Sequence, residues 1–251
     1  NYTGFNYTGK NNGNAVLKFT NPEYAFDVVS DKNGKAYKKP NFSNSSSISA
    51  VGAPDLPSRT TFIAVDPSKS YSLQVSYGSS RVIENIDIAP KGDWNELGSD
   101  QSISESNYSN IESFYPTNIA LLSEPMAMRE LSLVSLTVSP FRYFPQEKRL
   151  EEFMDIEVEL IETGNRESIN FFPNKRSRAF EPLYESLVEN YSSLNRENIP
   201  YQRPSILYVL PNNIGNLLGT VEVLMDWKRR MGYEVNSVSY THLRAHETSD
   251  Y

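Results

Sequence analysis

The feature that most constrains this chain is a change in its hydrophobic pattern near residue 204. Up to residue 161, apolar residues recur in short runs separated by Gly, Pro, Asn and Asp, which is typical of antiparallel β proteins. After residue 204, a continuous apolar run is followed by apolar residues at helical spacing and then by a second short run. The 251 residues therefore encode two kinds of folding unit, which is compatible with a typical domain length of about 150 residues.

The first region is predicted to be a series of β-strands. An Asn33-Gly34 pair indicates a hairpin, because both residues tolerate positive φ. The run at 131–138 has apolar side chains on both faces, so we expect both faces to be covered. At 155–161 acidic residues alternate with apolar ones, which predicts a half-buried antiparallel strand. The remaining expected strands are at 15–19, 25–29, 62–65, 70–76 and 81–88.

Composition and charge exclude several classes of function. Asp and Glu number 31 against 24 Lys and Arg, so the net charge of -7 repels nucleic acids and anionic lipids. No run approaches the length of about eighteen apolar residues that predicts a membrane-spanning helix. The 251 residues include no cysteine, which excludes disulfides, thiolate catalysis and Cys-ligated zinc within them.

The two ends of the sequence differ from the region between them. Residues 1–14 are rich in Asn, Tyr, Thr and Gly, show no signal peptide, and are expected to be frayed. Residues 238–251 resemble the translation of a sequencing adapter, so we exclude them from the fold. They hold both histidines, His242 and His246, whose spacing before Glu247 would otherwise suggest a metal site. Without them, neither a Ser-His-Asp triad nor a Cys-His dyad can be assembled.

Other candidate sites have plainer explanations. Asp155, Glu157 and Glu159 share one strand face and could ligate calcium, but calcium ligands normally converge from several segments. We therefore favour a solvated acidic face and predict no cofactor. The aromatic residues of 141–144 and Trp227 are interpreted as packing residues rather than as a ligand platform.

A short helix and a linker are predicted between the two regions. The helix is expected within 179–194, supported by the spacing of Leu183, Leu187, Val188 and Tyr191. Residues 191–204 contain two prolines and little apolar pattern, which indicates a linker.

After the linker, the sequence predicts the first β-α-β unit of an α/β domain. The run at 206–210 is of the kind buried on both faces of a parallel sheet, and a strand begins again at 233–235. The helix between them ends in a basic turn before Gly232. Its expected apolar stripe consists of Ile214, Leu217, Leu218, Val221, Leu224, Met225 and Lys228.

Two independent sets of motifs resemble one family. The series GAPDLP (52–57), FYP (114–116) and MRELSLVSLTVSPFRYFP (128–145) before the acidic strand resembles the propeptide domain of gingipain-type cysteine peptidases. The sequence ILYVL, the DWK of the following helix (226–228) and MGYEV (231–235) resemble the first strand, helix and second strand of the gingipain catalytic domain.

The resemblance implies a secreted or cell-surface zymogen. An antiparallel β-sandwich pro-domain would inhibit its own peptidase domain and assist its folding, and an incomplete α/β, caspase-like unit would follow. The parent would be a cysteine endopeptidase acting on protein substrates through a Cys-His dyad. In this family both catalytic residues lie beyond the first β-α-β unit, so no residue here inherits a catalytic role and this fragment is expected to be inactive. The expected divisions are 1–14 (frayed), 15–190 (pro-domain), 191–204 (linker), 205–237 (start of the peptidase domain) and 238–251 (adapter).

The resemblance also implies self-processing, because many peptidases of this family cleave after Arg or Lys. The candidates near the linker are Arg196, Arg178, Arg203 and Arg176. We rank Arg196 first because the residue after it is Glu197, so its surroundings are less hindered. Arg178 is second because it lies near the start of the predicted helix. Arg203 is followed by Pro204, whose ring obstructs cleavage. The alternative is that all four are solvated linker charges.

A second class of function is left open by the sequence. The aromatic content and Asn/Ser-rich segments such as 41–49 suit an adhesive or carbohydrate-binding β-sandwich module of a cell-surface protein. Such a module does not account for the ILYVL strand and the DWK helix that follow it.

Overall fold

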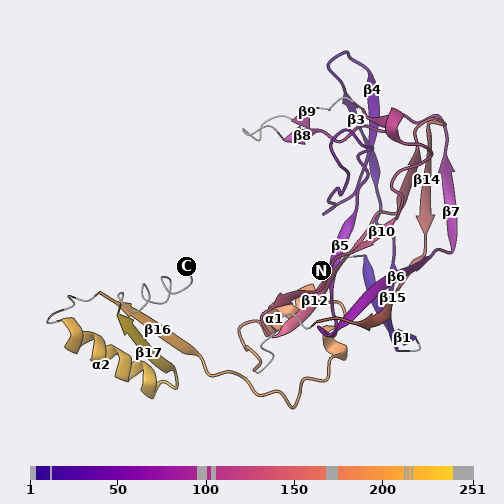
Figure 1. The fold of residues 1–251 in the computed structure, drawn as a ribbon. Coiled ribbons are helices and arrows are strands. Elements are labelled where there is room, and N and C mark those ends of the chain that lie inside the picture. The colour runs from indigo at the N-terminus through magenta and orange to yellow at the C-terminus, as the bar shows by residue number, and fades with distance from the viewer. Residues whose placement is uncertain are drawn as a thin grey trace. The chain divides into compact units, whose positions relative to one another are not determined.

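The computed structural model divides the chain into two compact units. The first comprises residues 1–174 and 179–196, and the second comprises 175–178 and 197–251 (Figure 1). The structure describes residues 4–11, 13–94, 101–102, 106–167, 175–211, 213, 215 and 217–239.

The first unit is built mainly from antiparallel strands, as predicted, and two four-stranded sheets form its centre. One sheet has the order β1-β2-β15-β6. In the other, β12 pairs with β5 along one edge and with β10 and β11 along the other. The strands of the first sheet are β1 (Phe5–Asn11), β2 (Asn14–Phe19), β6 (Lys69–Ser76) and β15 (Ile156–Asn165). Those of the second are β5 (Arg59–Ala64), β10 (Ala120–Leu122), β11 (Met126–Met128) and β12 (Leu131–Val138).

The main hydrophobic core lies between these two sheets, which makes them a β-sandwich. On β15, the alternating residues Ile156, Val158 and Leu160 are buried, as the sequence pattern predicted. They pack in one cluster with Val134, Leu136 and Val138 of β12. Other buried members of this cluster are Phe5, Leu17, Phe19, Ile63, Ile119, Ala120 and Phe153.

The prediction that residues 1–14 are frayed is wrong for β1. This strand pairs with β2 from Phe5 opposite Phe19 to Asn11 opposite Asn14, and the two Phe rings lie 4.8 Å apart. The residues of β1 lack a clear apolar alternation, so their strand conformation depends on the partner strand rather than on their own pattern.

The second face of β12 is covered by the segment after β15. Leu131 and Leu133 cluster there with Tyr184 of α1 (Glu181–Leu187), Val188, and Tyr191 of the 3₁₀ helix η2 (Tyr191–Ser193). Both faces of β12 are thus covered, as expected.

The helix predicted within 179–194 ends earlier, at Leu187, because the chain then pairs with the edge of β5. Glu189 N donates to Phe62 O, and the Asn190 side chain both accepts from Ala64 N and donates to Ala64 O. The expected apolar stripe is therefore only half correct, since Leu183 and Leu187 are exposed.

A second core lies beside the sandwich. It is formed by the sheet β13-β14-β7, by the hairpin β3-β4 and by neighbouring loops. The Asn33-Gly34 hairpin is present, with Gly34 at φ +80. The strand predicted at 81–88 ends at Ile83, and Asn85 follows with φ +54. The elements here are β3 (Ala25–Ser30), β4 (Ala36–Asn41), β7 (Ser79–Ile83), β13 (Phe141–Phe144), β14 (Arg149–Met154), the short strands β8 (Asp93–Trp94) and β9 (Gln101–Ser102), and η1 (Tyr108–Asn110).

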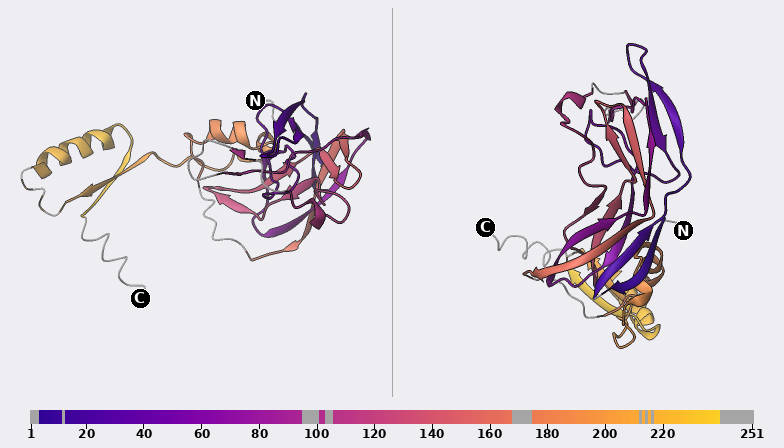
Figure 2. Two further views of the ribbon diagram at one scale, coloured as in Figure 1. Left: turned by 90° about the horizontal axis from the view of Figure 1, so that it is seen from above. Right: turned by 90° about the vertical axis from the view of Figure 1, so that its right-hand side faces the viewer.

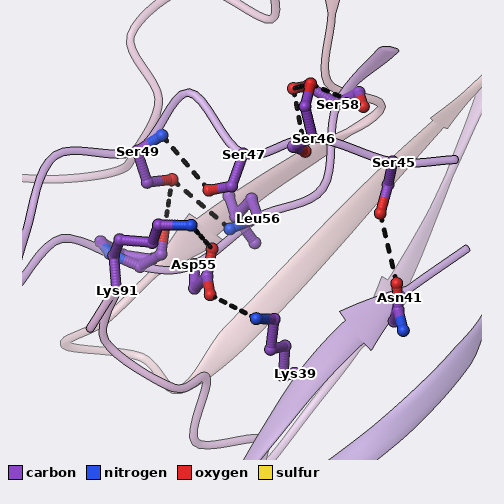
Figure 3. A network of polar contacts seen from close by, with 11 residues as sticks. Lys39, Asn41, Ser45, Ser46, Ser47, Ser49, Asp55, Leu56, Ser58 and Lys91 are labelled. Atoms are coloured by element: carbon purple, nitrogen blue, oxygen red, sulfur yellow. Dashed lines mark hydrogen bonds and ion pairs between the residues drawn. The ribbon is translucent and has the colours of Figure 1, made fainter. Parts of the chain in front are cut away.

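The polar segment after β4 is anchored by a buried charge. Asp55 is 4% exposed, and its carboxylate lies 2.8 Å from Lys39 Nζ and 3.6 Å from Lys91 Nζ (Figure 3). Ser46 and Ser58 pair through both backbone and side-chain groups at the ends of this segment. A sequence that reads as a surface loop is thus tied to the interior at several points.

The described residues of the second unit form two parallel strands and one helix, drawn from orange to yellow in Figures 1 and 2. β16 (Ser205–Leu210) leads to α2 (Leu217–Arg230), and β17 (Glu234–Ser239) follows after Gly232, which has φ +92. Of the stripe expected on α2, Met225 is buried, whereas Leu217, Leu218 and Leu224 are exposed. Val221 and Lys228, which also belong to this stripe, are half-buried, and its remaining residue, Ile214, lies outside the described residues. The β-like SINFF run at 168–172 also lies outside them.

Candidate processing segment

The four candidate arginines occupy two different environments. Arg196 is the last residue of the first unit and is 7% exposed. Arg176, Arg178 and Arg203 belong to the second unit, where Arg178 and Arg203 are exposed.

The guanidinium of Arg196 is held by Glu130 and by two tyrosines, Tyr184 of α1 and Tyr191 of η2. Nη1 donates to Tyr191 Oη at 2.6 Å, and Nη2 donates to Glu130 Oε1 at 3.2 Å. The guanidinium carbon also lies 5.8 Å from the ring centre of Tyr184 and 5.4 Å from that of Tyr191. Cation–π contact and two charge-assisted hydrogen bonds therefore act on one side chain.

Glu130 is the acceptor at the centre of this arrangement. It directly precedes β12, and its side chain is 4% exposed. The residue before it, Arg129, has φ +53. Its second oxygen, Oε2, accepts a hydrogen bond from Tyr184 Oη at 3.0 Å. Burial and then the Glu130 hydrogen bond raise the pKa of Tyr184 well above its usual range.

The premise that Arg196 lies in exposed linker is therefore wrong. Its partner Glu130 is 66 residues away in sequence, and no local pattern connects the two. The polar residues on either side of Arg196 favour a solvated side chain, whereas the structure buries this side chain and pairs it with Glu130. Pairing explains how a buried charge is tolerated.

Two of the other three arginines, Arg176 and Arg178, are arranged around Tyr201. Arg176 N donates to Pro200 O at 2.9 Å, and Gln202 N donates to Arg176 O at 2.7 Å. The guanidinium groups of Arg176 and Arg178 lie 4.5 and 4.7 Å from the Tyr201 ring centre. The backbone around Arg176 is thus engaged, whereas Arg178 is joined to its surroundings by its side chain.

The acidic strand face forms pairs with neighbouring side chains. Glu157 lies 3.8 Å from Lys18 Nζ, and Glu159 accepts from Asn14 Nδ2 at 2.9 Å. Asp155 has φ +54 and lies before β15, outside the strand. Among the residues that the structure describes, no group of three or more acidic or histidine side chains could hold a metal. His242 and His246 lie outside that set.

The aromatic candidates lie in different surroundings. Phe141 and Tyr143 are buried in the second core, as packing residues are expected to be. Trp227 is half exposed, with Lys228 Nζ 4.6 Å from its ring centre.

Within the described part of the chain, no helix is long and apolar enough to cross a membrane.

A second buried glutamate, paired with the exposed Arg81, provides a comparison for Glu130. Glu152 of β14 is 4% exposed, and its Oε2 accepts from Arg81 Nε at 2.9 Å and Nη2 at 2.6 Å and from Tyr24 Oη at 3.0 Å. These three residues line an open groove of about 710 Å³. The two pairs share their chemistry, a buried glutamate with an arginine and a tyrosine, but only the Glu130 pair involves a candidate processing residue.

Comparison with proteins of known sequence places these features in a family. The Propeptide_C25 family model matches residues 9–192. Gingipain R2 of Porphyromonas gingivalis strain W83 is 27% identical over 225 residues, which cover 86% of this chain and 30% of the relative. Gingipain R1 of the same species is 25% identical over 223 residues, which cover 86% of this chain and 22% of the relative. The chain thus spans less than a third of the length of these relatives.

Solved structures share the fold. A complex of the pro- and mature domains of RgpB from P. gingivalis contains a chain that matches with a TM-score of 0.67 and 23% identity, over 77% of this chain and 99% of that one. A structure concerned with the zymogenic latency of gingipain K from the same species matches with a TM-score of 0.54 and 19% identity, over 64% of this chain and 93% of that one. Because the family model covers well over half of its residues, the chain belongs to the Propeptide_C25 family.

Proposed function

We propose that this chain is the N-terminal part of a gingipain-like cysteine peptidase zymogen. Its first unit is the pro-domain, which binds the peptidase domain of the same protein, keeps it inactive and assists its folding. The observation that carries the proposal is the family match over residues 9–192, which lie almost entirely within the first unit.

The division of the chain follows from the same proposal. The pro-domain covers β1 and the following residues of the first unit up to Arg196, residues 197–204 connect it to the next domain, and 205–237 begin a caspase-like peptidase domain. The parallel β16-α2-β17 arrangement supports this start of an α/β domain. The whole protein would be secreted or on the cell surface and would cleave protein substrates. The 251 residues contain no cysteine to act as the nucleophile, so the activity belongs to the parent.

The adhesive alternative is less well supported. The aromatic residues that suggested a ligand platform, Phe141 and Tyr143, are at most 1% exposed. The family match and the fold of the relatives both favour the pro-domain.

Inhibition in trans tests the proposed function. The 251-residue chain, mixed with a mature gingipain-type peptidase, should reduce the cleavage of a peptide substrate at micromolar concentration or below. An unrelated papain-type peptidase serves as a control and should retain its activity. A folded preparation that leaves the gingipain-type peptidase fully active would overturn the proposal.

Maturation is proposed to occur within 175–203. The exposure of Arg178 and Arg203 supports these two as the accessible positions, although Pro204 obstructs the second. Cleavage after Arg196 requires that its side chain first leave the Glu130 pair. Limited trypsin digestion should produce early cuts confined to this segment, and early cuts within 60–160 would contradict the assignment.

A further inference from the structure

We propose that Glu130 acts as a lock on Arg196 and so sets the order in which the processing segment is cleaved. The inference rests on the proposed function for its biological meaning, because it concerns maturation. The protection of the Arg196–Glu197 bond in the folded first unit is inferred from the contacts of Arg196 alone.

The lock follows from the competition for one side chain. A peptidase that cleaves after arginine must take the guanidinium into its own specificity pocket and hold the neighbouring backbone in an extended conformation. The guanidinium of Arg196 is already bound to Glu130 and Tyr191 within the first unit. It cannot occupy both places, so cleavage has to wait for the Glu130 pair to open.

The backbone before Arg196 strengthens the protection. Ser193 N donates to Asn190 O and Leu194 N donates to Tyr191 O, which closes the chain into the 3₁₀ turn η2. Tyr191 is itself anchored, because its hydroxyl donates to Glu181 Oε2 at 2.5 Å. Extraction of Arg196 therefore breaks a set of coupled contacts.

Arg178 is the natural internal reference. It is exposed, and the contact that holds its guanidinium is the one with the Tyr201 ring at 4.7 Å. Arg178 is followed by Ala179, which does not carry the obstruction that Pro204 brings to Arg203. In the folded chain the Arg178–Ala179 bond should be cleaved well before the Arg196–Glu197 bond.

The test uses the full chain and a small amount of trypsin, with mass spectrometry of the new termini Ala179 and Glu197 over time. Glu130→Gln keeps the size of the side chain and removes its charge. When opening is fast relative to cleavage, the rate follows the population of the open form. The ratio of cleavage at Arg196 to cleavage at Arg178 should therefore rise about tenfold or more in this variant.

Glu152→Gln is the matched control. It neutralises an equally buried glutamate paired with Arg81 in the same unit, away from the contacts of Arg196. If general destabilisation were the cause, both variants would raise the ratio equally, and the lock would be refuted. Equal early cleavage at Arg178 and Arg196 in the unaltered chain would also refute it.

A second variant keeps the test decisive. If Glu130→Gln does not fold, Arg196→Lys leaves a trypsin site but loses the second of the paired guanidinium donors, and it should raise cleavage at 196 relative to 178. An unchanged ratio in a folded Arg196→Lys chain would contradict the lock. Because trypsin replaces the parent peptidase, this result does not depend on inhibition in trans, so the proposed function and the lock can fail separately.

Discussion

The two units of the chain use similar apolar residues with different results. In the sandwich, both faces of β12 are buried, and Val134 and Leu136 have no exposed surface. In the second unit, the apolar strand β16 keeps Leu207 57% exposed, and Val223 of α2 is 71% exposed. The first unit surrounds β12 with a second sheet and with α1, whereas the described residues of the second unit supply one helix and one neighbouring strand. An apolar pattern therefore indicates which residues are suited to burial, and the layers around them decide whether they are buried.

The largest expected effect is on hydrogen exchange. Amides of β12 and β15 should exchange only by global unfolding, with a free energy of about 5–15 kcal/mol. Amides of β16 and β17 should exchange by local opening at a free energy several kcal/mol lower, because so little apolar surface holds these strands together. Exchange measured by mass spectrometry on the full chain compares both regions at once. Protection of 205–239 equal to that of the sandwich would remove the contrast between the units.

A pair of leucine truncations sharpens the contrast. Leu136→Ala removes a fully buried side chain from the main core and should lower the free energy of unfolding of the first unit by about 2–5 kcal/mol. Leu207→Ala, on the exposed strand β16, should change stability by less than about 1 kcal/mol. Urea titration followed by circular dichroism measures both. Equal losses would show that β16 is packed as tightly as β12.

Much of the sandwich could be predicted from sequence because its signals are local. The alternation of Ile156, Val158 and Leu160 predicts their burial, and the Asn33-Gly34 pair predicts its hairpin. β1 lacks such a signal, and its conformation depends on pairing with β2. The end of α1 likewise depends on the edge of β5, through contacts of Asn190 that span 126 residues.

The candidate site was harder to predict than the fold. Sequence identifies which arginines are available, but their exposure depends on partners that are distant in the chain. Glu130 precedes a recognised strand and carries no motif of its own, so nothing local connects it to Arg196. A weak signal is present in the helical spacing of Val188 and Tyr191, which indicates that the chain just before Arg196 packs on a core.

Two glycines with similar backbone angles provide the third test. Gly4 has φ +85, and a Cβ there would lie 3.1 Å from Phe19 Cε2 and 3.2 Å from Thr20 O. Gly232 has φ +92, and nothing lies within 4 Å of its Cβ position. Gly4→Ala introduces both backbone strain and steric crowding and should lower the free energy of unfolding of the first unit by about 2 kcal/mol. Gly232→Ala introduces backbone strain alone and should lower that of the second unit by about 1 kcal/mol. Thermal unfolding monitored separately in each unit distinguishes them, and a larger loss from Gly232→Ala would contradict the packing difference.

The smallest expected effect is alkaline destabilisation of the first unit through its buried tyrosines. Burial raises the pKa of Tyr143 to about 12, compared with about 10 in the unfolded chain. The unfolded state therefore loses this proton first as the pH rises, and the stabilisation is present below pH 10 and lost between about pH 10 and pH 12. After allowance for solvent screening, the loss should be on the order of 1 kcal/mol. In Tyr143→Phe, loss of the hydrogen bond to Ile86 O lowers stability at every pH, but the free energy of unfolding should fall less steeply above pH 10 than in the unaltered chain. Urea titrations at pH 8, 10 and 11 give these slopes, and identical slopes in the two proteins would show that Tyr143 is not responsible for the alkaline loss.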